Sequence, residues 1–244
     1  MESSYSAHNK SKIARNRNLN RAKDELTEES DNMTTLVLIL GTVFFVFDLV
    51  MIGVGLWELD RMKKTENLDT AGPIPMGWNN WSARRIATLA VVMALSVVAS
   101  LIPIPSPSGT VALDLAPGYF MALFGGPING AIAIFFGHMA VATRAGFPLT
   151  VPVHIGIGIA CSGVGAALWF FRRRLGNNTP ALVIAIVIAI IGNTFGSNIL
   201  LSYLFVGAAM AIGTVPPILI GSSANVIVGS LVWVAIRGFR GARV

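Results

Sequence analysis

Long apolar runs separated by short polar segments fill most of the chain from Met76 to the C-terminus. A bilayer core needs about 20 apolar residues per helix, so such runs predict transmembrane helices. We place six of them at about residues 86–104, 116–126, 128–145, 150–171, 181–205 and 215–236, the second being short and ending in glycines. A further run at 34–57 contains Asp48. The pattern predicts an all-α integral membrane protein, a six-helix bundle with one extra N-terminal hydrophobic helix.

Composition supports the membrane class and divides the chain. The sequence is 54% hydrophobic and 12% charged, whereas about 25% charged residues is usual in soluble domains. Eleven of the twelve acidic residues lie within residues 1–69, only Asp114 follows, and no lysine occurs after Lys64. We therefore expect a charged N-terminal tail (1–33) that is disordered, the extra helix (34–57), a linker (58–79) and a six-helix membrane domain (80–244).

The arginines predict the orientation of the six-helix domain. They lie before its first helix, after its fourth and after its sixth, at Arg84, Arg85, Arg172, Arg173, Arg174, Arg237, Arg240 and Arg243. With both ends of the domain in the cytoplasm, these eight are inside and only Arg144 is outside, as the positive-inside rule requires. We expect a multi-pass protein of the cell membrane with a cytoplasmic C-terminus. Clustering at the ends of apolar runs also argues against nucleic-acid binding, despite the net charge of +6.

The N-terminal run fits this orientation less well. If residues 34–57 span the membrane, the basic residues before them are extracellular, although six nearby acids offset their charge. A helix lying at the membrane interface, or translation starting at Met76, are alternatives, since residues 76–244 look complete by themselves. The first 30 residues do not resemble a signal peptide, because acids rather than an apolar region follow the basic stretch. The role of residues 1–75 stays open.

Polar residues of the domain gather in its predicted outer half. They are His138, Thr143, Arg144, His154, Asn193, Thr194, Ser197, Asn198, Ser202, Tyr203, Ser222, Ser223, Asn225 and the loop 103–114. A polar group in hydrocarbon costs several kcal/mol unless it is paired or faces a cavity. For any single residue, hydrogen bonding between packed helices is an alternative. The one-sided distribution of the whole set predicts a polar pocket that opens outward.

Catalytic interpretations find little support in the sequence. No Glu follows Glu66, so a His-Glu-x-x-His site is absent, and the single Asp114 cannot form an aspartyl protease pair. The segment "GTVPPILIGSS" lacks the lysine of a P-loop, and His138 with His154 lacks a carboxylate for a metal site. We expect no enzyme activity, no metal and no cofactor. An intramembrane enzyme using both histidines, or a membrane assembly factor, remain alternative functions.

Six predicted helices with cytoplasmic ends, a Pro- and Ser-rich first outer loop and the string "DLAPGYFMALFGGPINGAIAIFFGH" occur together in the domain. This combination resembles the substrate-binding S component of energy-coupling factor (ECF) transporters. It implies uptake of a vitamin or vitamin precursor from outside, energised by a T component and two ATPase subunits. The spacing of Ala83, Ala87, Ala90 and Ala94 in "ARRIATLAVVMALS" is similar to the AxxxA surface that docks on the T component.

The string "GHMAVATRAGFPLTVPVH", residues 137–154, is most similar to S components assigned to alpha-ribazole, a precursor in cobalamin salvage. An S component for another vitamin is the alternative. For a dimethylbenzimidazole riboside we expect ring stacking on Phe147 or Tyr119 and hydrogen bonds from His138, His154 and Asn193. Arg144 either bonds ligand oxygens or extends to outer headgroups. The full set of expected substrate-binding residues is Asp114, Tyr119, His138, Arg144, Phe147, His154, Asn193, Ser197 and Asn225.

Overall fold

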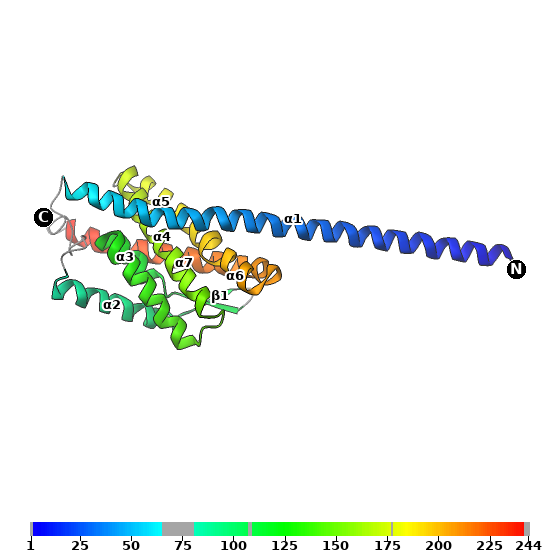
Figure 1. Ribbon diagram of the computed structural model, residues 1–244. Helices are drawn as coiled ribbons and strands as arrows, with labels where there is room; N and C mark the ends of the chain where they lie inside the picture. The colour runs from blue at the N-terminus through cyan, green and yellow to red at the C-terminus, as the bar shows by residue number, and fades with distance from the viewer. Residues whose placement is uncertain (1, 65–80, 107–108, 177, 242–244) are drawn as a thin grey trace.

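The computed structural model describes residues 2–64, 81–106, 109–176 and 178–241 (Figure 1). Its helices and strands are α1 (Glu2–Lys63), α2 (Ala83–Ala99), β1 (Pro103–Ser106), β2 (Gly109–Ala112), α3 (Ala116–Ala145), α4 (Val151–Leu175), α5 (Thr179–Ile191), the π-helical η1 (Gly192–Ile199), α6 (Leu200–Val206) and α7 (Ala208–Gly241). Within these residues, five helical stretches are long and apolar enough to cross a membrane. The all-α membrane bundle expected from the sequence is confirmed.

Helix α3 is a hairpin of two antiparallel helices. Gly126 interrupts it with φ 84° and ψ 174°, and Pro127 follows. A Cβ on Gly130 would lie 2.5 Å from the Cα of Ala122, so the chain after the break packs directly on the chain before it. The short second run and the third run of the sequence prediction are therefore separate helices joined at a glycine, which can adopt positive φ without strain.

The bundle has two ends with different chemistry. Helices α2 and α5 run from the first end to the second, and α4 and α7 return. We call the first end the arginine end, because Arg84, Arg85, Arg172, Arg173, Arg174 and Arg237 lie there. We call the second the loop end, which carries the β1–β2 hairpin and the turn between α3 and α4. Figure 1 shows that α1 and α7 both finish at the arginine end.

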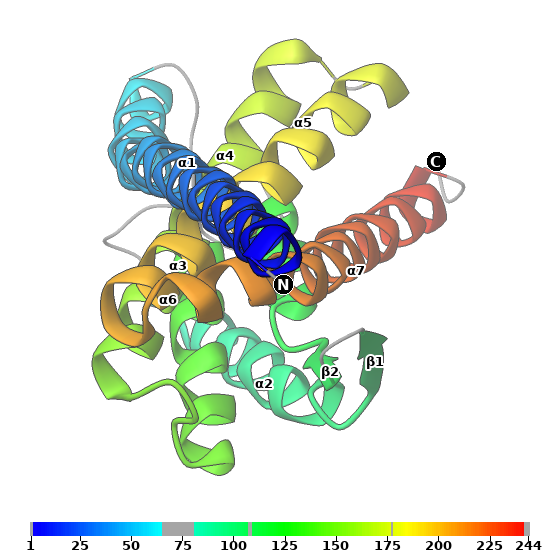
Figure 2. The same cartoon turned by 90° about the vertical axis from the view of Figure 1, so that its right-hand side faces the viewer.

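Helix α1 extends across both the hydrophobic run 34–57 and the charged segment before it. At 1.5 Å per residue, its 62 residues make a rod of about 93 Å. Only its second half lies beside the other helices, as Figure 1 shows, and Figure 2 looks along the rod from its N-terminal end. The proposed division into tail, helix and linker stays a prediction, and residues 65–79 of the linker lie outside the described residues.

The second half of α1 packs closely on α4 and η1 through glycines. A Cβ on Gly163 would collide with the backbone of Asp48, at 2.5 Å from its carbonyl carbon, and one on Gly196 would lie 2.7 Å from the carbonyl carbon of Phe44. Asp48 is fully buried at this contact. The small-residue spacing of Gly192 and Gly196 predicts a close backbone approach, and the structure shows that the neighbour is α1.

Several helix boundaries differ from the sequence prediction by a few residues, and two of them involve prolines. Helix α2 ends at Ala99 rather than near residue 104, because Pro103 begins β1 and biases the preceding residue away from helical backbone. Helix α7 begins at Ala208 rather than residue 215 and continues through Pro216 and Pro217. In apolar helices, local adjustments and Ser or Thr side chains compensate for the missing proline N–H groups.

Candidate ligand-binding cavity

A cavity of about 400 Å³ lies at the loop end, between β2 and helices α3, α4 and α7 with η1. Its polar lining is Asp114, His138, His154, Asn193, Asn198, Ser222 and Asn225. Leucine, isoleucine, valine and alanine side chains form most of the remaining wall. Pockets for small organic ligands are usually this size, mainly apolar, and contain a few placed polar groups. Five of the nine sequence-predicted substrate-binding residues come together here.

Asp114, His138 and His154 form a hydrogen-bonded chain along one wall. Nδ1 of His138 lies 2.8 Å from Oδ2 of Asp114, and Nδ1 of His154 lies 3.2 Å from Nε2 of His138. Asp114 and His154 are buried, with 7% and 8% of their surfaces exposed. Three segments distant in sequence supply the chain: the loop before α3, the second helix of α3, and the first turn of α4.

These two hydrogen bonds determine whether Nε2 of His154 is a donor or an acceptor. The Asp114 carboxylate accepts a hydrogen bond from Nδ1–H of His138, so Nε2 of a neutral His138 accepts a hydrogen bond from Nδ1–H of His154. Nε2 of a neutral His154 then carries no hydrogen and is an acceptor. That atom is buried and has no hydrogen-bond partner among the described residues. A ligand hydroxyl or N–H group would satisfy it.

Asn193 enters the cavity wall from the π-helical segment η1. Its Oδ1 accepts a hydrogen bond from Sγ of Cys161 at 3.2 Å, and its backbone oxygen accepts one from Nδ2 of Asn198 at 2.9 Å. Within the described side chains, its Nδ2 makes no hydrogen bond. Short π-helical segments often occur at functional sites, because they redirect side chains that a regular α-helix would bury elsewhere. Asn193 therefore offers a donor to a ligand.

Asn225 lines the cavity but is fully occupied by the backbone. Its Oδ1 accepts from the backbone N–H groups of Leu115 and Ala116, each at 2.8 Å, and its Nδ2 donates to the carbonyls of Ala112 and Gly221, each at 2.9 Å. Leu115, at the N-cap of α3, provides no side-chain cap of its own. Asn225 thus caps α3 from α7 and fixes β2, which positions the neighbouring Asp114.

Phe147 belongs to the turn that joins α3 to α4. Gly146 ends α3 with φ 77°, and Phe147 and Thr150 also have positive φ, at 51° and 89°. Non-glycine residues with such backbones are strained and are frequent near binding sites. The Phe147 ring lies 5.7 Å from the ring of His154, edge to face, although Phe147 is not part of the cavity lining. The turn therefore places an aromatic ring beside the histidine wall.

The remaining predicted residues lie outside the lining. Arg144 is exposed and its Nη2 donates to Oγ of Ser100 at 3.2 Å, which links the ends of α3 and α2. Tyr119 is fully buried in the hydrophobic core with Leu123 and Ile134. The backbone of Ser197 belongs to η1, but its side chain lies outside the described residues.

Sequence reasoning did not find the connections between these groups. It placed Asp114 and both histidines on one side of the membrane but did not pair them, although Asp114 is the only acid after residue 69. It also did not anticipate that Asn225 caps a distant helix; the absence of a capping side chain before Ala116 was the available signal. Asn198 and Ser222 line the cavity in addition to the predicted set.

The exposed face of α2 carries all four predicted docking alanines. Helix α2 buries Arg85, Leu89, Val92 and Ser96. Ala83, Ala87, Ala90 and Ala94 are exposed, together with larger apolar residues such as Ile86 and Val91. Among the described residues, no group of three or more His, Cys, Asp or Glu side chains has the geometry of a metal site.

The fold and the cavity together define a class of protein, an all-α, multi-pass membrane protein with a ligand-sized cavity at one end of its helix bundle. The model of one family, the ECF-type riboflavin transporter S component, matches residues 80–237. Because the match covers more than half of the chain, the protein belongs to this S-component family. It is a substrate-binding subunit for vitamin uptake and not an enzyme, and the family implies a T component and ATPase partners.

A solved structure described as "Structure and mechanism of the S component of a bacterial ECF transporter" is also similar. It shares 20% sequence identity, covers 66% of this chain and 95% of its own, and superposes with a TM-score of 0.38. No curated protein matches the chain.

Proposed function

We propose that this S component captures an aromatic vitamin precursor carrying a hydroxylated sugar, with alpha-ribazole as the first candidate, in the cavity at the loop end. The observation that carries the proposal is the Asp114–His138–His154 chain in the cavity wall. The arginine end is predicted to be cytoplasmic, so the cavity faces the outside of the cell membrane. The N-terminal half of α1 then lies outside as well.

The polar groups of the cavity match a riboside better than a purely apolar ligand. Nε2 of His154 accepts from a sugar hydroxyl, while Nδ2 of Asn193 donates to a ring nitrogen or a sugar oxygen. Apolar walls such as Ile157 and Leu149 cover the faces of a flat ring. Phe147 packs edge to face against His154 from the turn and so helps to hold that ring in the cavity wall.

Riboflavin is the second candidate, because the family model that matches the chain is described as a riboflavin transporter S component. It also combines a flat heterocycle with a hydroxylated five-carbon chain, so the same donors and acceptors apply. Arg144, which bonds Ser100, contributes to either ligand only if it leaves that contact. Tyr119 supports the cavity from the core rather than stacking on the ligand.

Energy for transport would come from a T component and two ATPase subunits. We propose that the T component docks on the exposed face of α2 formed by Ala83, Ala87, Ala90 and Ala94. Small side chains on an exposed apolar helix allow another helix to approach closely in the membrane. This face lies on a different surface from the cavity lining, so binding and docking are separable.

Equilibrium binding to the purified full chain in detergent, without ATP, tests the proposal. Alpha-ribazole is titrated by calorimetry and riboflavin by quenching of its own fluorescence. Tight binding of alpha-ribazole with weak binding of riboflavin supports the first candidate, and the reverse result selects the second. If neither binds, the cavity does not serve this ligand class.

Substitutions at His154 test the role of the histidine chain. His154→Phe removes the acceptor and should weaken binding about tenfold or more, since one hydrogen bond to a buried partner contributes about 1–3 kcal/mol. His154→Gln retains a polar side chain and should lose less. Thr143→Val is the matched control, because Thr143 is exposed at the same end and its Oγ1 donates to the backbone oxygen of Met139 in its own helix. Equal affinity in all three variants would place the ligand elsewhere.

A further inference from the structure

Helix α1 precedes the residues that match the S-component family, which begin at residue 80, yet it packs along the six-helix domain. Its buried residues recur at steps of three, four or seven positions and include Val37, Gly41, Asp48, Met51, Gly55 and Glu58. Steps that alternate between three and four average 3.5 residues, the spacing with which one face of a helix stays in contact with a neighbour. The proposed vitamin-binding function assigns no role to this contact.

Near its middle, α1 contacts η1, the π-helical segment of the cavity wall. A Cβ on Gly192 would lie 2.9 Å from Oδ1 of Asp48, and one on Gly196 would meet Oδ2 of the same carboxylate. About one turn earlier in α1, the ring of Phe44 lies 6.0 Å from the ring of Phe195 in η1. The carboxylate and the ring therefore pack directly on η1, at the face where its two glycines leave room.

The π-helical form of η1 brings two cavity residues together. Asn193 and Asn198 both line the cavity, and Nδ2 of Asn198 donates to the backbone oxygen of Asn193 at 2.9 Å. In an α-helix with 3.6 residues per turn, residues five apart point about 140° away from each other. In a π-helix, where hydrogen bonds join residues five apart, such residues lie on the same side. A return of η1 to a regular α-helix would therefore remove one of the two asparagines from the cavity wall.

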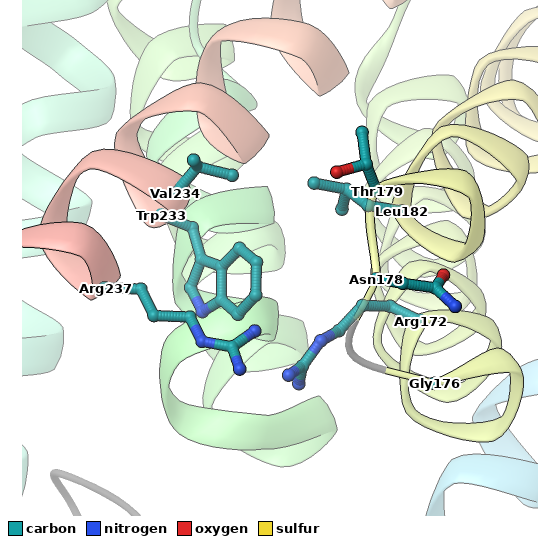
Figure 3. Close-up of a pocket in the computed structure, with 8 residues that line it drawn as sticks. All are labelled: Arg172, Gly176, Asn178, Thr179, Leu182, Trp233, Val234 and Arg237. Carbon is teal, nitrogen blue, oxygen red and sulfur yellow. The ribbon is translucent and has the colours of Figure 1, made fainter. Parts of the chain in front are cut away.

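A second cavity, of about 350 Å³, lies at the arginine end between α4, α5 and α7 (Figure 3). Arg172 and Arg237 contact the ring of Trp233 there, with guanidinium carbons 4.5 and 5.3 Å from the ring centroid. Among the described residues of its lining, none belongs to α1 or η1. The contact between α1 and η1 therefore bears on the cavity at the loop end.

We propose that α1 is a positioning helix for the ligand cavity: Phe44 and Asp48 hold η1 in its π-helical form and so keep Asn193 and Asn198 in the cavity wall. The inference rests on the proposed function, because it concerns the same cavity. Neither Phe44 nor Asp48 is among the described residues of the lining, so both act through η1 rather than by touching the ligand. A change in α1 should therefore weaken ligand capture while every residue that contacts the ligand is kept.

Phe44→Ala and Phe47→Ala in the full chain form a matched pair. Both remove a half-buried ring from α1, but the ring of Phe47 stacks on Phe171 of α4, at 6.4 Å between centroids, rather than on η1. The two rings also contact each other edge to face, so each variant loses that contact as well. Because similar packing is lost, the two melting temperatures should fall by similar amounts.

Ligand affinity should separate the two variants. Alpha-ribazole and riboflavin are titrated into the purified full chain, and the compound that the unaltered chain binds is used for the variants. Phe44→Ala should bind it about three- to tenfold more weakly, the loss expected when one hydrogen bond from an asparagine is broken. Phe47→Ala should bind it as the unaltered chain does.

The thiol of Cys161, the sole cysteine of the chain, reports on η1 without any ligand. It is fully buried, donates to Oδ1 of Asn193 at 3.2 Å, and is not among the described lining residues. A small neutral maleimide should therefore react with it several-fold faster once Asn193 is displaced. We expect this in Phe44→Ala, but not in Phe47→Ala or in Phe44→Tyr, which keeps a ring against Phe195.

The two readouts separate failure of the inference from failure of the proposed function. If the unaltered chain binds neither compound, the proposed function fails, while faster labelling of Cys161 in Phe44→Ala alone still supports the positioning role. If Phe44→Ala matches the unaltered chain in binding and labelling, or if both alanine variants change equally, the inference is overturned. Phe44→Leu, which retains part of the side-chain volume, gives the same test should Phe44→Ala not fold.

Discussion

The contact between α1 and the six-helix domain gives the sharpest structural prediction. A methyl group on Gly163 would collide with the carbonyl oxygen of Asp48 and lie 2.5 Å from its carbonyl carbon. The obstacle is helix backbone, so no side-chain rotation relieves the collision. Gly163→Ala must therefore push the second half of α1 away from α4.

The size of the effect follows from packing energetics. Overpacking a core costs about 1–3 kcal/mol, and displacement of a whole helix favours the upper part of that range. With a change of about 2–4 °C per kcal/mol for a chain of 150–250 residues, the apparent melting temperature should fall by roughly 6–12 °C. Thermal unfolding in detergent, followed by intrinsic fluorescence, measures the shift.

Gly53→Ala is the matched control, since it makes the same change within α1 at a position with no atom within 4 Å. Alanine there should be neutral or stabilise the helix by up to about 1 kcal/mol. If Gly163→Ala and Gly53→Ala melt at the same temperature as the unaltered chain, α1 does not pack on α4 through Asp48, and the reasoning fails.

Three further substitutions test other parts of the structure. Asn225→Leu removes the cap of α3 and should destabilise the protein by about 2–6 kcal/mol, because two buried N–H groups lose their acceptor at about 1–3 kcal/mol each; unchanged thermal unfolding would contradict the capping role. Gly146→Ala should cost about 1–2 kcal/mol through its φ of 77° alone, since no atom lies within 4 Å; a melting temperature equal to that of the unaltered chain would argue against this turn. Ala90→Trp should abolish vitamin uptake by the assembled transporter while binding to the isolated chain persists; lost binding would show that α2 does not act only as a docking surface.

Much of the fold follows from the sequence, because each membrane helix is determined by a run of apolar residues that are neighbours in the chain. Apolar runs of the right length, the glycine-terminated run before Pro127 and the distribution of arginines predict the six-helix domain. The same reasoning placed Asp114, His138, His154 and Asn193 on one side of the membrane, where the structure forms a cavity. Polar groups cannot face hydrocarbon unpaired, so their one-sided clustering carries information without any coordinates.

Only the tertiary structure decided how these groups connect. The sequence alone does not show that His138 bridges Asp114 to His154, or that all four hydrogen-bonding positions of Asn225 serve the backbone. The same holds for Asp48, buried against glycines of α4 and η1, and for Arg172 and Arg237 beside Trp233. The physical reason is the range of the interactions. A local pattern determines whether a segment is a helix and which residues share its face, whereas pairing between helices depends on how their faces meet in three dimensions.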